Sequence, residues 1–110
     1  MLLEKLPLIS LDLETTGLQT RTDRVVQIGA IDPYDATNYL DMLVNPDMAI
    51  PPRSTDIHGI SDDMVADKPL LTQAFPRLRD SINDRVVIGY NIGFDLAIIA
   101  AETDRHGIAW

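Results

Sequence analysis

Residues 6–18 read LPLISLDLETTGL, an apolar run that ends in two acids and a turn. Its apolar first part, Leu6 to Leu13, predicts a strand that enters a hydrophobic core. Asp12 and Glu14 lie at the end of this strand, and because side chains alternate along a strand, their carboxylates share one face. Two neighbouring carboxylates repel each other unless a positive charge lies between them. The pair alone leaves open a site for Mg²⁺, which binds oxygen ligands, and two acids that simply end a strand in solvent. The tight polar turn at residues 15–18 favours the metal site, because Gly17 would let the backbone approach a ligand closely.

The rest of the chain predicts a mixed order of strands and helices. After the first strand we expect two strands, at 24–31 and 38–44, joined by a turn at 32–35 and followed by a proline-rich loop at 45–53. A short helical turn at 61–64 and a helix capped by Thr72, with Pro76 in its first turn, come next. A buried strand at 85–90 and a largely buried helix at 94–103 complete the predicted elements. The order β-β-β-α-β-α is typical of an α/β fold in which helices flank a mixed sheet. Because a parallel sheet usually continues after such a helix, we expect residues 1–110 to be the truncated N-terminal portion of a single domain.

The composition narrows the function. The 110 residues are 45% hydrophobic and 24% charged, which suits one globular domain. No apolar run approaches the roughly 20 residues that a membrane-spanning helix needs, and a chain without cysteine has no disulfides or thiolate sites. We therefore expect a cytoplasmic protein without a membrane partner. The net charge of −8, from 9 basic and 17 acidic residues, argues against nucleic-acid binding unless some carboxylates hold divalent cations.

A second group of polar residues follows the predicted strand at 85–90. The sequence GYNIGFD, residues 89–95, opens the last predicted helix. Asp95 is either an acid favoured by the N-terminal end of a helix dipole or a carboxylate presented at the carboxyl edge of the sheet. His58 is either a hydrogen-bonded loop histidine or a residue beside a substrate. The residues alone leave both pairs of alternatives open.

These motifs resemble a known family. LDLETTGL, residues 11–18, is similar to the first motif of the DEDD 3′–5′ exonuclease superfamily, and Asn91, Phe94 and Asp95 are similar to its second, Asn-x-x-Phe-Asp. The segments that resemble the branch with the proofreading (epsilon) subunit of bacterial DNA polymerase III are NP at 45–46, IP at 50–51 and IHGI at 57–60. The resemblance covers nearly the whole chain, with both motifs on the expected elements.

The resemblance implies a ribonuclease H-like fold and hydrolysis of nucleotides from the 3′ end of DNA or RNA with two divalent ions, Mg²⁺ or Mn²⁺. Asp12 would contact both ions, Glu14 would bind the ion that activates water, and Asp95 would support the other ion, partly through water. These three residues are the implied catalytic and metal-binding set. The residues implied to contact the terminal nucleotide are Thr15, Thr16, Gly17, Leu18, His58, Asn91 and Phe94. The implied partners are nucleic acid with a free 3′ end and, for the full-length protein, polymerase subunits.

Two departures from the family pattern concern the last part of the chain. Tyr90 occupies the position where many members have histidine, although Asn91 keeps the amide. The third motif, a general-base histidine followed by an aspartate, has no match, because Asp104 precedes His106. We assign neither, and we expect the 110 residues alone to be inactive or nearly so, since loss of a general base typically costs about 10²–10⁴ in rate. A missing last strand would expose apolar sheet edge, which predicts dimerisation or marginal stability.

Two other functions compete with this interpretation. An aspartyl-nucleophile phosphatase also begins with an apolar strand that ends in aspartate, but it needs Asp-x-Asp-x-Thr, and Glu14 replaces the second aspartate. A non-catalytic relative would use the same fold to bind a nucleotide or a partner. The joint presence of Asp12, Glu14 and Asp95 argues against such a relative, because burying acids without a cation is unfavourable.

Overall fold

The structure is a computed structural model that describes residues 6–109, so residues 1–5 and 110 of the predicted domain lie outside it. Its helices and strands are β1 (Leu8–Thr15), β2 (Val25–Asp32), β3 (Asp35–Leu43), α1 (Pro52–His58), α2 (Asp62–Val65), α3 (Leu71–Ile82), β4 (Val86–Ile88) and α4 (Ile92–Arg105). The strands form one sheet in the order β3-β2-β1-β4. β1 is antiparallel to β2 and parallel to β4, and β2 is antiparallel to β3, so the predicted mixed sheet with flanking helices is confirmed.

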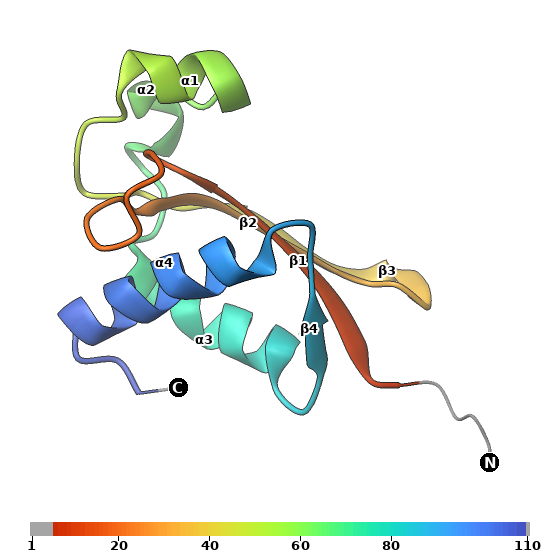
Figure 1. Ribbon diagram of the computed structural model, residues 1–110. Helices are drawn as coiled ribbons and strands as arrows, with labels where there is room; N and C mark the ends of the chain where they lie inside the picture. The colour runs from red at the N-terminus through yellow and green to blue at the C-terminus, as the bar shows by residue number, and fades with distance from the viewer. Residues whose placement is uncertain (1–5, 110) are drawn as a thin grey trace.

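The main core lies between one face of the sheet and the helices α3 and α4 (Figure 1). β1 alternates in burial, because Leu11 and Leu13 face this core while Asp12 is exposed and Glu14 is partly buried. The helices add apolar residues from their buried faces, namely Leu71, Ala74, Phe75, Leu78, Ile98 and Ile99. The alternation confirms the prediction that the two carboxylates share the face of β1 that is turned away from the core.

A bulge in β2, where its pairing with β1 shifts by one residue, sets which face of the sheet Val25 and Val26 occupy. Glu14 is opposite Gln27 but Thr15 is opposite Val25, which leaves Val26 as the extra residue of a bulge. Val25 packs into the main core, whereas Val26 packs into a second, smaller cluster. The other buried members of that cluster are Ile50, Ile60 and Val65. Since these residues belong to α2 and to the segments on either side of α1, the bulge ties the α1–α2 region to the sheet.

The segment expected as a proline-rich loop, 45–53, runs into a helix, so this prediction is wrong for its last two residues. α1 begins at Pro52 because the fixed backbone angle of proline suits the first helical position. The helix ends at His58, and Gly59, with φ 78°, takes the left-handed conformation that closes it. Arg53 and His58 therefore lie on a helix rather than in a loop.

The longer helices also differ in detail from expectation. α3 begins at Leu71, so Thr72 does not cap it and Pro76 falls in its second turn. The start is fixed instead by Gln73, whose side-chain oxygen accepts a hydrogen bond from the N–H of Leu70 at 2.9 Å. Within the described part of the chain, none of the helices has the length and apolar character needed to cross a membrane.

β4 is shorter and more exposed than expected. The predicted buried strand at 85–90 reduces to Val86–Ile88, and it lies at the edge of the sheet with Val86 52% and Ile88 39% exposed. α4 buries one face only, since Leu96 is 36% exposed. Between residues 6 and 109, no strand covers the outer side of β4, and the sheet edge is apolar and open. The dimerisation expected from such an edge stays a prediction.

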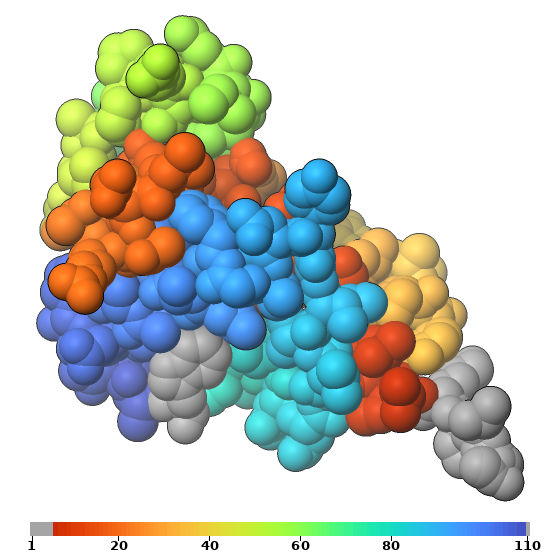
Figure 2. All heavy atoms as spheres, in the orientation of Figure 1, coloured from red at the N-terminus to blue at the C-terminus, as the bar shows by residue number. Residues whose placement is uncertain are grey.

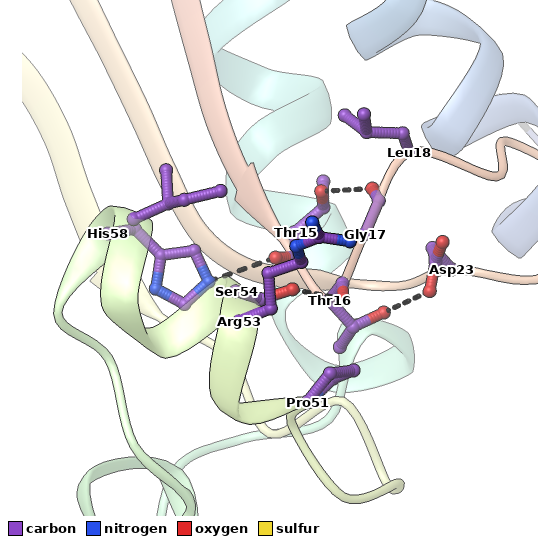
Figure 3. Close-up of a pocket in the computed structure, with 10 residues that line it drawn as sticks. Thr15, Thr16, Gly17, Leu18, Asp23, Pro51, Arg53, Ser54 and His58 are labelled. Carbon is purple, nitrogen blue, oxygen red and sulfur yellow. Dashed lines mark hydrogen bonds between the residues drawn. The ribbon is translucent and has the colours of Figure 1, made fainter.

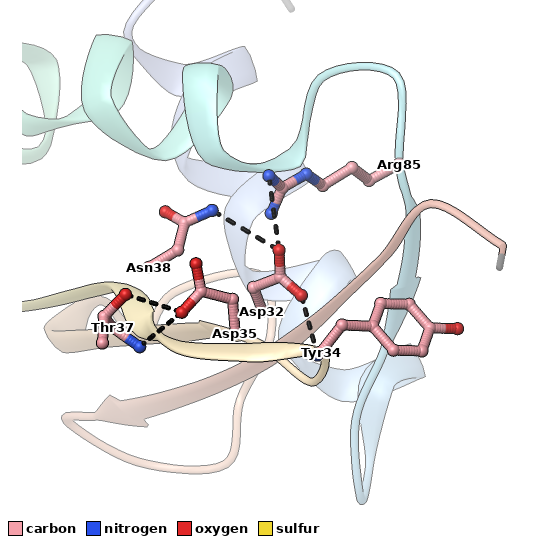
Figure 4. A network of polar contacts seen from close by, with 6 residues as sticks. All are labelled: Asp32, Tyr34, Asp35, Thr37, Asn38 and Arg85. Atoms are coloured by element: carbon pink, nitrogen blue, oxygen red, sulfur yellow. Dashed lines mark hydrogen bonds and ion pairs between the residues drawn. The ribbon is translucent and has the colours of Figure 1, made fainter.

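A polar network fixes the β2–β3 hairpin at the end of the sheet where β1 begins (Figure 4). Asp32 accepts a hydrogen bond from the side chain of Asn38 at 3.5 Å and lies 3.9 Å from the guanidinium of Arg85. Asp35 accepts hydrogen bonds from the hydroxyl and then the main-chain N–H of Thr37, which lower the pKa of Asp35. These two acids hold the hairpin, and they lie at the opposite end of β1 from the carboxylate pair.

Candidate active site

Three carboxylates lie within range of one another's charges near the second half of β1. β4 pairs only with residues 8–10 of β1, so in the described chain no strand flanks that side of Asp12 and Glu14. Asp95 lies in the first turn of α4 and is 5% exposed. Burial, and then the charges of Asp12 and Glu14, raise the pKa of Asp95 to about 6. The structure thus brings the three predicted acids into one electrostatic neighbourhood.

Gly89 explains how the start of α4 comes so close to β1. A Cβ atom at Gly89 would lie 2.5 Å from the main-chain oxygen of Leu11. Because a real Cβ atom cannot approach an oxygen so closely, any other residue would push the turn before α4 away from β1. Glycine lets this turn pass beside the strand, and Asp95 follows it into the range of the Asp12 charge.

The three acids have no compensating partners in the described chain. Between residues 6 and 109, neither a hydrogen bond nor an ion pair reaches the carboxylates of Asp12, Glu14 and Asp95. Carboxylate oxygens are the ligands that hard divalent cations such as Mg²⁺ or Mn²⁺ prefer, and such a cation would relieve the repulsion among the three acids. In the same part of the chain, no three His, Cys, Asp or Glu side chains are gathered closely enough to hold an ion by themselves. The residues therefore fit a cation in their chemistry without forming a closed coordination shell.

A pocket of about 650 Å³ lies at the end of β1, and none of the three acids is among its lining residues (Figure 3). Its lining residues are Thr15, Thr16, Gly17, Leu18, Asp23, Pro51, Arg53, Ser54, Ile57 and His58. Five of the residues predicted to contact the terminal nucleotide, at positions 15–18 and 58, meet in this one place. Asn91 and Phe94 are not among its lining residues, because Asn91 is exposed just before α4 and Phe94 packs against the main core.

The turn after β1 uses its hydroxyl groups internally. Thr15 donates its hydroxyl hydrogen to the carbonyl of Gly17 at 2.7 Å. Thr16 donates its own to Asp23 at 2.8 Å and accepts a hydrogen bond from the N–H of Arg24 at 2.9 Å. The hydroxyl hydrogens of both threonines are therefore engaged in bonds of this turn, and neither is free to donate to a ligand in the pocket.

The rim of the pocket combines two exposed apolar side chains with the positive charge of an arginine. Leu18 is 82% and Ile57 is 81% exposed, one from the turn after β1 and the other from α1. The exposed side chain of Arg53 lies on the same helix. An apolar rim with a guanidinium beside it suits a ligand that has a flat apolar part and an anionic part, as a nucleotide does.

His58 braces the pocket from α1. Its Nδ1 accepts a hydrogen bond from the main-chain N–H of Ile60 at 3.1 Å, and its Nε2 lies 3.0 Å from the carbonyl oxygen of Thr15. Because the amide can only donate and the carbonyl can only accept, the ring is in the neutral form that carries its hydrogen on Nε2. The histidine is thus a hydrogen-bonded residue and a pocket residue at once.

Comparison with known proteins decides the family. A family model described as an exonuclease matches residues 9–109. The chain belongs to the exonuclease family. The resemblance to the DEDD 3′–5′ exonuclease superfamily is thereby confirmed, and the phosphatase alternative is set aside.

The relatives of this exonuclease-family chain include a DNA polymerase III subunit epsilon and an epsilon-like protein. The DNA polymerase III subunit epsilon of Treponema pallidum is 34% identical over 101 residues, covering 90% of this chain and 47% of that protein. A DNA polymerase III subunit epsilon-like protein of Rhodobacter capsulatus is 37% identical over 102 residues, which are 88% of this chain and 14% of that protein. The chain thus spans about half, or less, of the length of the curated relatives it matches.

Solved structures agree with the ribonuclease H-like fold. Exonuclease X, in complex with 5′ overhanging duplex DNA, is 32% identical with a TM-score of 0.69, covering 83% of this chain and 52% of its own. Exonuclease I from E. coli, in complex with a dT13 oligonucleotide, has a TM-score of 0.81 over 94% of this chain and 25% of its own. At 21% identity, the second match bears on the fold alone.

Residues near the end of this exonuclease-family chain lie away from the carboxylates. His106 follows the last turn of α4 and is exposed, as is Asp104. Asp95 is at the other end of the helix, and eleven residues of helix at about 1.5 Å each separate it from His106 by roughly 16 Å. The decision to assign neither residue to the third motif agrees with this placement. Tyr90, in the turn before α4, is fully exposed.

Sequence reasoning missed two residues that organise the site. Asp23 accepts hydrogen bonds from the Thr16 hydroxyl and from the N–H of Gln19, both at 2.8 Å, and so closes the turn after β1. Glu102 is a 3% exposed carboxylate in α4 that bonds to the start of β2. A signal for Glu102 was present, because an acid seven residues after Asp95 falls on the same, otherwise apolar, helix face.

Proposed function

We propose that this chain is the N-terminal portion of an exonuclease domain that hydrolyses nucleotides from the 3′ end of DNA or RNA. Residues 1–110 would then supply the first two motifs, and the remainder of the natural polypeptide the third. The observation that carries the proposal is that Asp12, Glu14 and Asp95 lie within range of one another's charges without compensating partners in the described chain, while a pocket with an apolar rim begins at Thr15, the next residue of β1. Membership of the exonuclease family supports the reaction class.

The three carboxylates are the residues that would hold two divalent cations, Mg²⁺ or Mn²⁺. When bound, such ions supply Lewis-acid stabilisation of a phosphodiester and make water a stronger nucleophile. Asp12 presents an exposed carboxylate on the sheet face and Glu14 a partly buried one, while Asp95 presents a third from α4. Two divalent cations would offset half of the formal charge of −8. That offset would remove the main objection to an acidic chain binding nucleic acid.

The pocket at positions 15–18 would receive the terminal nucleotide. Leu18 and Ile57 would pack on the base, and Arg53 would lie near a phosphate. His58 would act there mainly by holding the carbonyl of Thr15 in place. Asn91 would approach the nucleotide from the turn before α4, with Phe94 beneath the site. Packing the base against these two apolar side chains would fix the position of the nucleotide in the pocket.

The setting of the full-length protein follows from the same reasoning. We propose polymerase subunits as partners, because the relatives include epsilon subunits of DNA polymerase III, and a cytoplasmic location. DNA is the first substrate to test, since the exonuclease X structure contains DNA. The 110 residues by themselves are expected to be inactive or nearly so, because a general base from the third motif is absent from this sequence.

A labelled single-stranded oligonucleotide with a free 3′ end tests the proposal. The natural polypeptide, with the sequence that adjoins these residues, is expected to shorten it stepwise from the 3′ end when Mn²⁺ is added. Asp12→Ala should abolish the shortening, and Asp41→Ala, which removes an exposed acid from the neighbouring part of the sheet, should leave it intact. Tight nucleotide binding without shortening of DNA or RNA would overturn the proposal and favour a non-catalytic, nucleotide- or partner-binding relative.

A further inference from the structure

The last turn of α4 holds the loop between β1 and β2. Glu102, which is 3% exposed, accepts a hydrogen bond from the main-chain N–H of Val25 at 2.5 Å. Arg105, one turn later, donates from its guanidinium to the carbonyl of Arg21 at 2.8 Å. In the space-filling view, the orange loop after β1 lies directly against the blue surface of α4 (Figure 2). α4 therefore contacts this loop through two bonds to its main chain.

The held segment continues into the pocket. Residues Arg24 and Thr16 are bonded main chain to main chain, from the Thr16 N–H to the Arg24 carbonyl at 2.8 Å. The Arg24 N–H in turn donates to the Thr16 hydroxyl, and that hydroxyl donates to Asp23. A displacement of Val25 would therefore move Arg24 and, with it, the turn at 16–18 that forms one wall of the pocket.

Glu102 and Asp95 belong to the same buried face of α4, seven residues apart. The helix thus connects Asp95, a candidate metal ligand in its first turn, with Glu102, which bonds to the loop near its other end. A role in packing alone would be met by an apolar side chain, without the desolvation of a carboxylate. Burial raises the pKa of Glu102, and the bond from the Val25 N–H works in the opposite direction, as do the charges of Arg105 and Arg24. The amide of Val25, at a residue that is itself 1% exposed, needs this acceptor because an unpaired buried N–H is unfavourable.

We propose that Glu102 is a positioning residue for the pocket. By holding the N–H of Val25, it fixes the turn at 16–18 relative to Asp95, so that a nucleotide in the pocket lies at a set distance from the carboxylates. The proposal rests on the proposed exonuclease function for its kinetic consequence, but the contact with the loop is testable without any activity.

The test compares two substitutions at one position in the natural polypeptide. Glu102→Gln keeps an oxygen acceptor for Val25, whereas Glu102→Leu keeps the approximate volume and removes the acceptor. Ile99→Val is the matched control, because Ile99 is fully buried on the same helix face and does not bond to the loop. Hydrogen exchange of the amides of residues 17–25 and steady-state kinetics on a single-stranded oligonucleotide are measured for all three, at a temperature where each is folded.

Glu102→Leu is expected to speed exchange in the loop about tenfold or more and to raise KM about tenfold with a smaller change in kcat, because substrate placement is disturbed while the carboxylates remain. Glu102→Gln should keep the exchange rate and KM within about twofold of the wild type.

If the leucine variant does not fold, Arg105→Ala, at an exposed position, should produce the same pattern more weakly. Exchange as slow in Glu102→Leu as in Ile99→Val, or kinetics that Gln fails to rescue, would overturn the proposal. If the wild type has no exonuclease activity, only the proposed function is overturned. The hydrogen-exchange measurement still shows whether Glu102 holds the loop.

Discussion

The turn after β1 and the carboxylates within β1 are neighbours in the sequence but are built in opposite ways. In the turn, polar groups satisfy each other, and Thr16 alone takes part in four hydrogen bonds through its N–H, carbonyl and hydroxyl groups. Two residues earlier, Glu14 forms no hydrogen bond with its side chain anywhere in residues 6–109, and the same is true of Asp12 and Asp95.

The difference separates what holds shape from what receives a ligand. Mutually bonded groups lower the free energy of one conformation, so the turn is rigid before anything binds. Unpartnered, mutually repelling carboxylates raise the free energy of the folded chain, and such groups are characteristic of functional sites. The comparison therefore makes opposite predictions for mutations in the two regions, because removing a polar group should destabilise the turn and stabilise the carboxylate cluster.

The largest expected effect is on activity in the carboxylate cluster. Glu14→Gln, in the natural polypeptide, should lower the rate of metal-dependent 3′ shortening by about 10²–10³, because it removes a charge that would hold a cation. Asp41→Asn, on β3 of the same sheet, is the matched control and should change the rate less than twofold. Rates on a labelled oligonucleotide at saturating Mn²⁺ decide the matter, and equal rates for the two variants would contradict a functional role for the cluster.

The next effect is a gain of stability. The pKa of Asp95 in the folded protein, about 6, lies above the value of about 3.9 in an unfolded chain. Folding therefore opposes ionisation of this group, and stability falls as the pH rises from about 4 to about 6 and stays lower above that range. Asp95→Asn should raise the free energy of unfolding at pH 8, without metal, by up to about 3 kcal/mol, and should have little effect near pH 4.

Urea unfolding in the presence of a chelator, at both pH values, measures this effect. Asp104→Asn, at the exposed other end of α4, is the control and should be neutral at each pH. A loss of stability for Asp95→Asn at pH 8 would show that the carboxylate is compensated within the protein, and the contrast between the two regions would fail.

The turn should respond in the opposite direction. Thr16→Val keeps the shape of the side chain but leaves Asp23 and the N–H of Arg24 without their partner, and it should cost about 1–3 kcal/mol. Thr22→Val, at an exposed position of the same loop, should cost less than about 0.5 kcal/mol. Thermal unfolding of both variants compares them, and similar melting temperatures would mean that the hydrogen bonds of the turn contribute little.

The smallest effect concerns two glycines. A Cβ atom at Gly17 would lie 2.5 Å from a carboxylate oxygen of Asp23, whereas nothing lies within 4 Å of one at Gly93, inside α4. Gly17→Ala should therefore destabilise by about 1 kcal/mol, and Gly93→Ala should stabilise by up to about 1 kcal/mol, because alanine favours a helix. Denaturant midpoints for the pair give the comparison, and a stabilising Gly17→Ala would show that Asp23 moves aside freely.

Features that depend on local periodicity could be predicted from the sequence. The alternation in β1 placed Asp12 and Glu14 opposite the leucines, and the hairpin of β2 and β3 followed from two apolar runs around a turn. The exposure of β4 could not be read from its composition, because Val86 and Ile88 are apolar at an edge that no described strand covers. Edge position is a property of the sheet order and not of the strand.

The candidate site divides in the same way. Its acids and the pocket wall stand out as motifs, whereas their organisers do not, because Glu102 bonds to Val25 across 77 residues of chain. Such pairings depend on the helix-to-sheet geometry that the whole fold sets. The start of α1 was missed for a local reason, since Pro52 both signals a loop and suits a first helical turn. Whether the three acids bind metal stays a prediction.

The bulge at Val26 has a consequence for how this sequence can change over time. Val25 and Ile28 are three residues apart and yet both face the main core, which the period of two of a regular strand does not allow, while Val26 faces the second cluster. Exchanges among valine, isoleucine and leucine would keep both clusters filled. A deletion of one residue here would restore the regular period and leave one cluster without its valine, so β2 constrains the spacing of its residues more tightly than their identity.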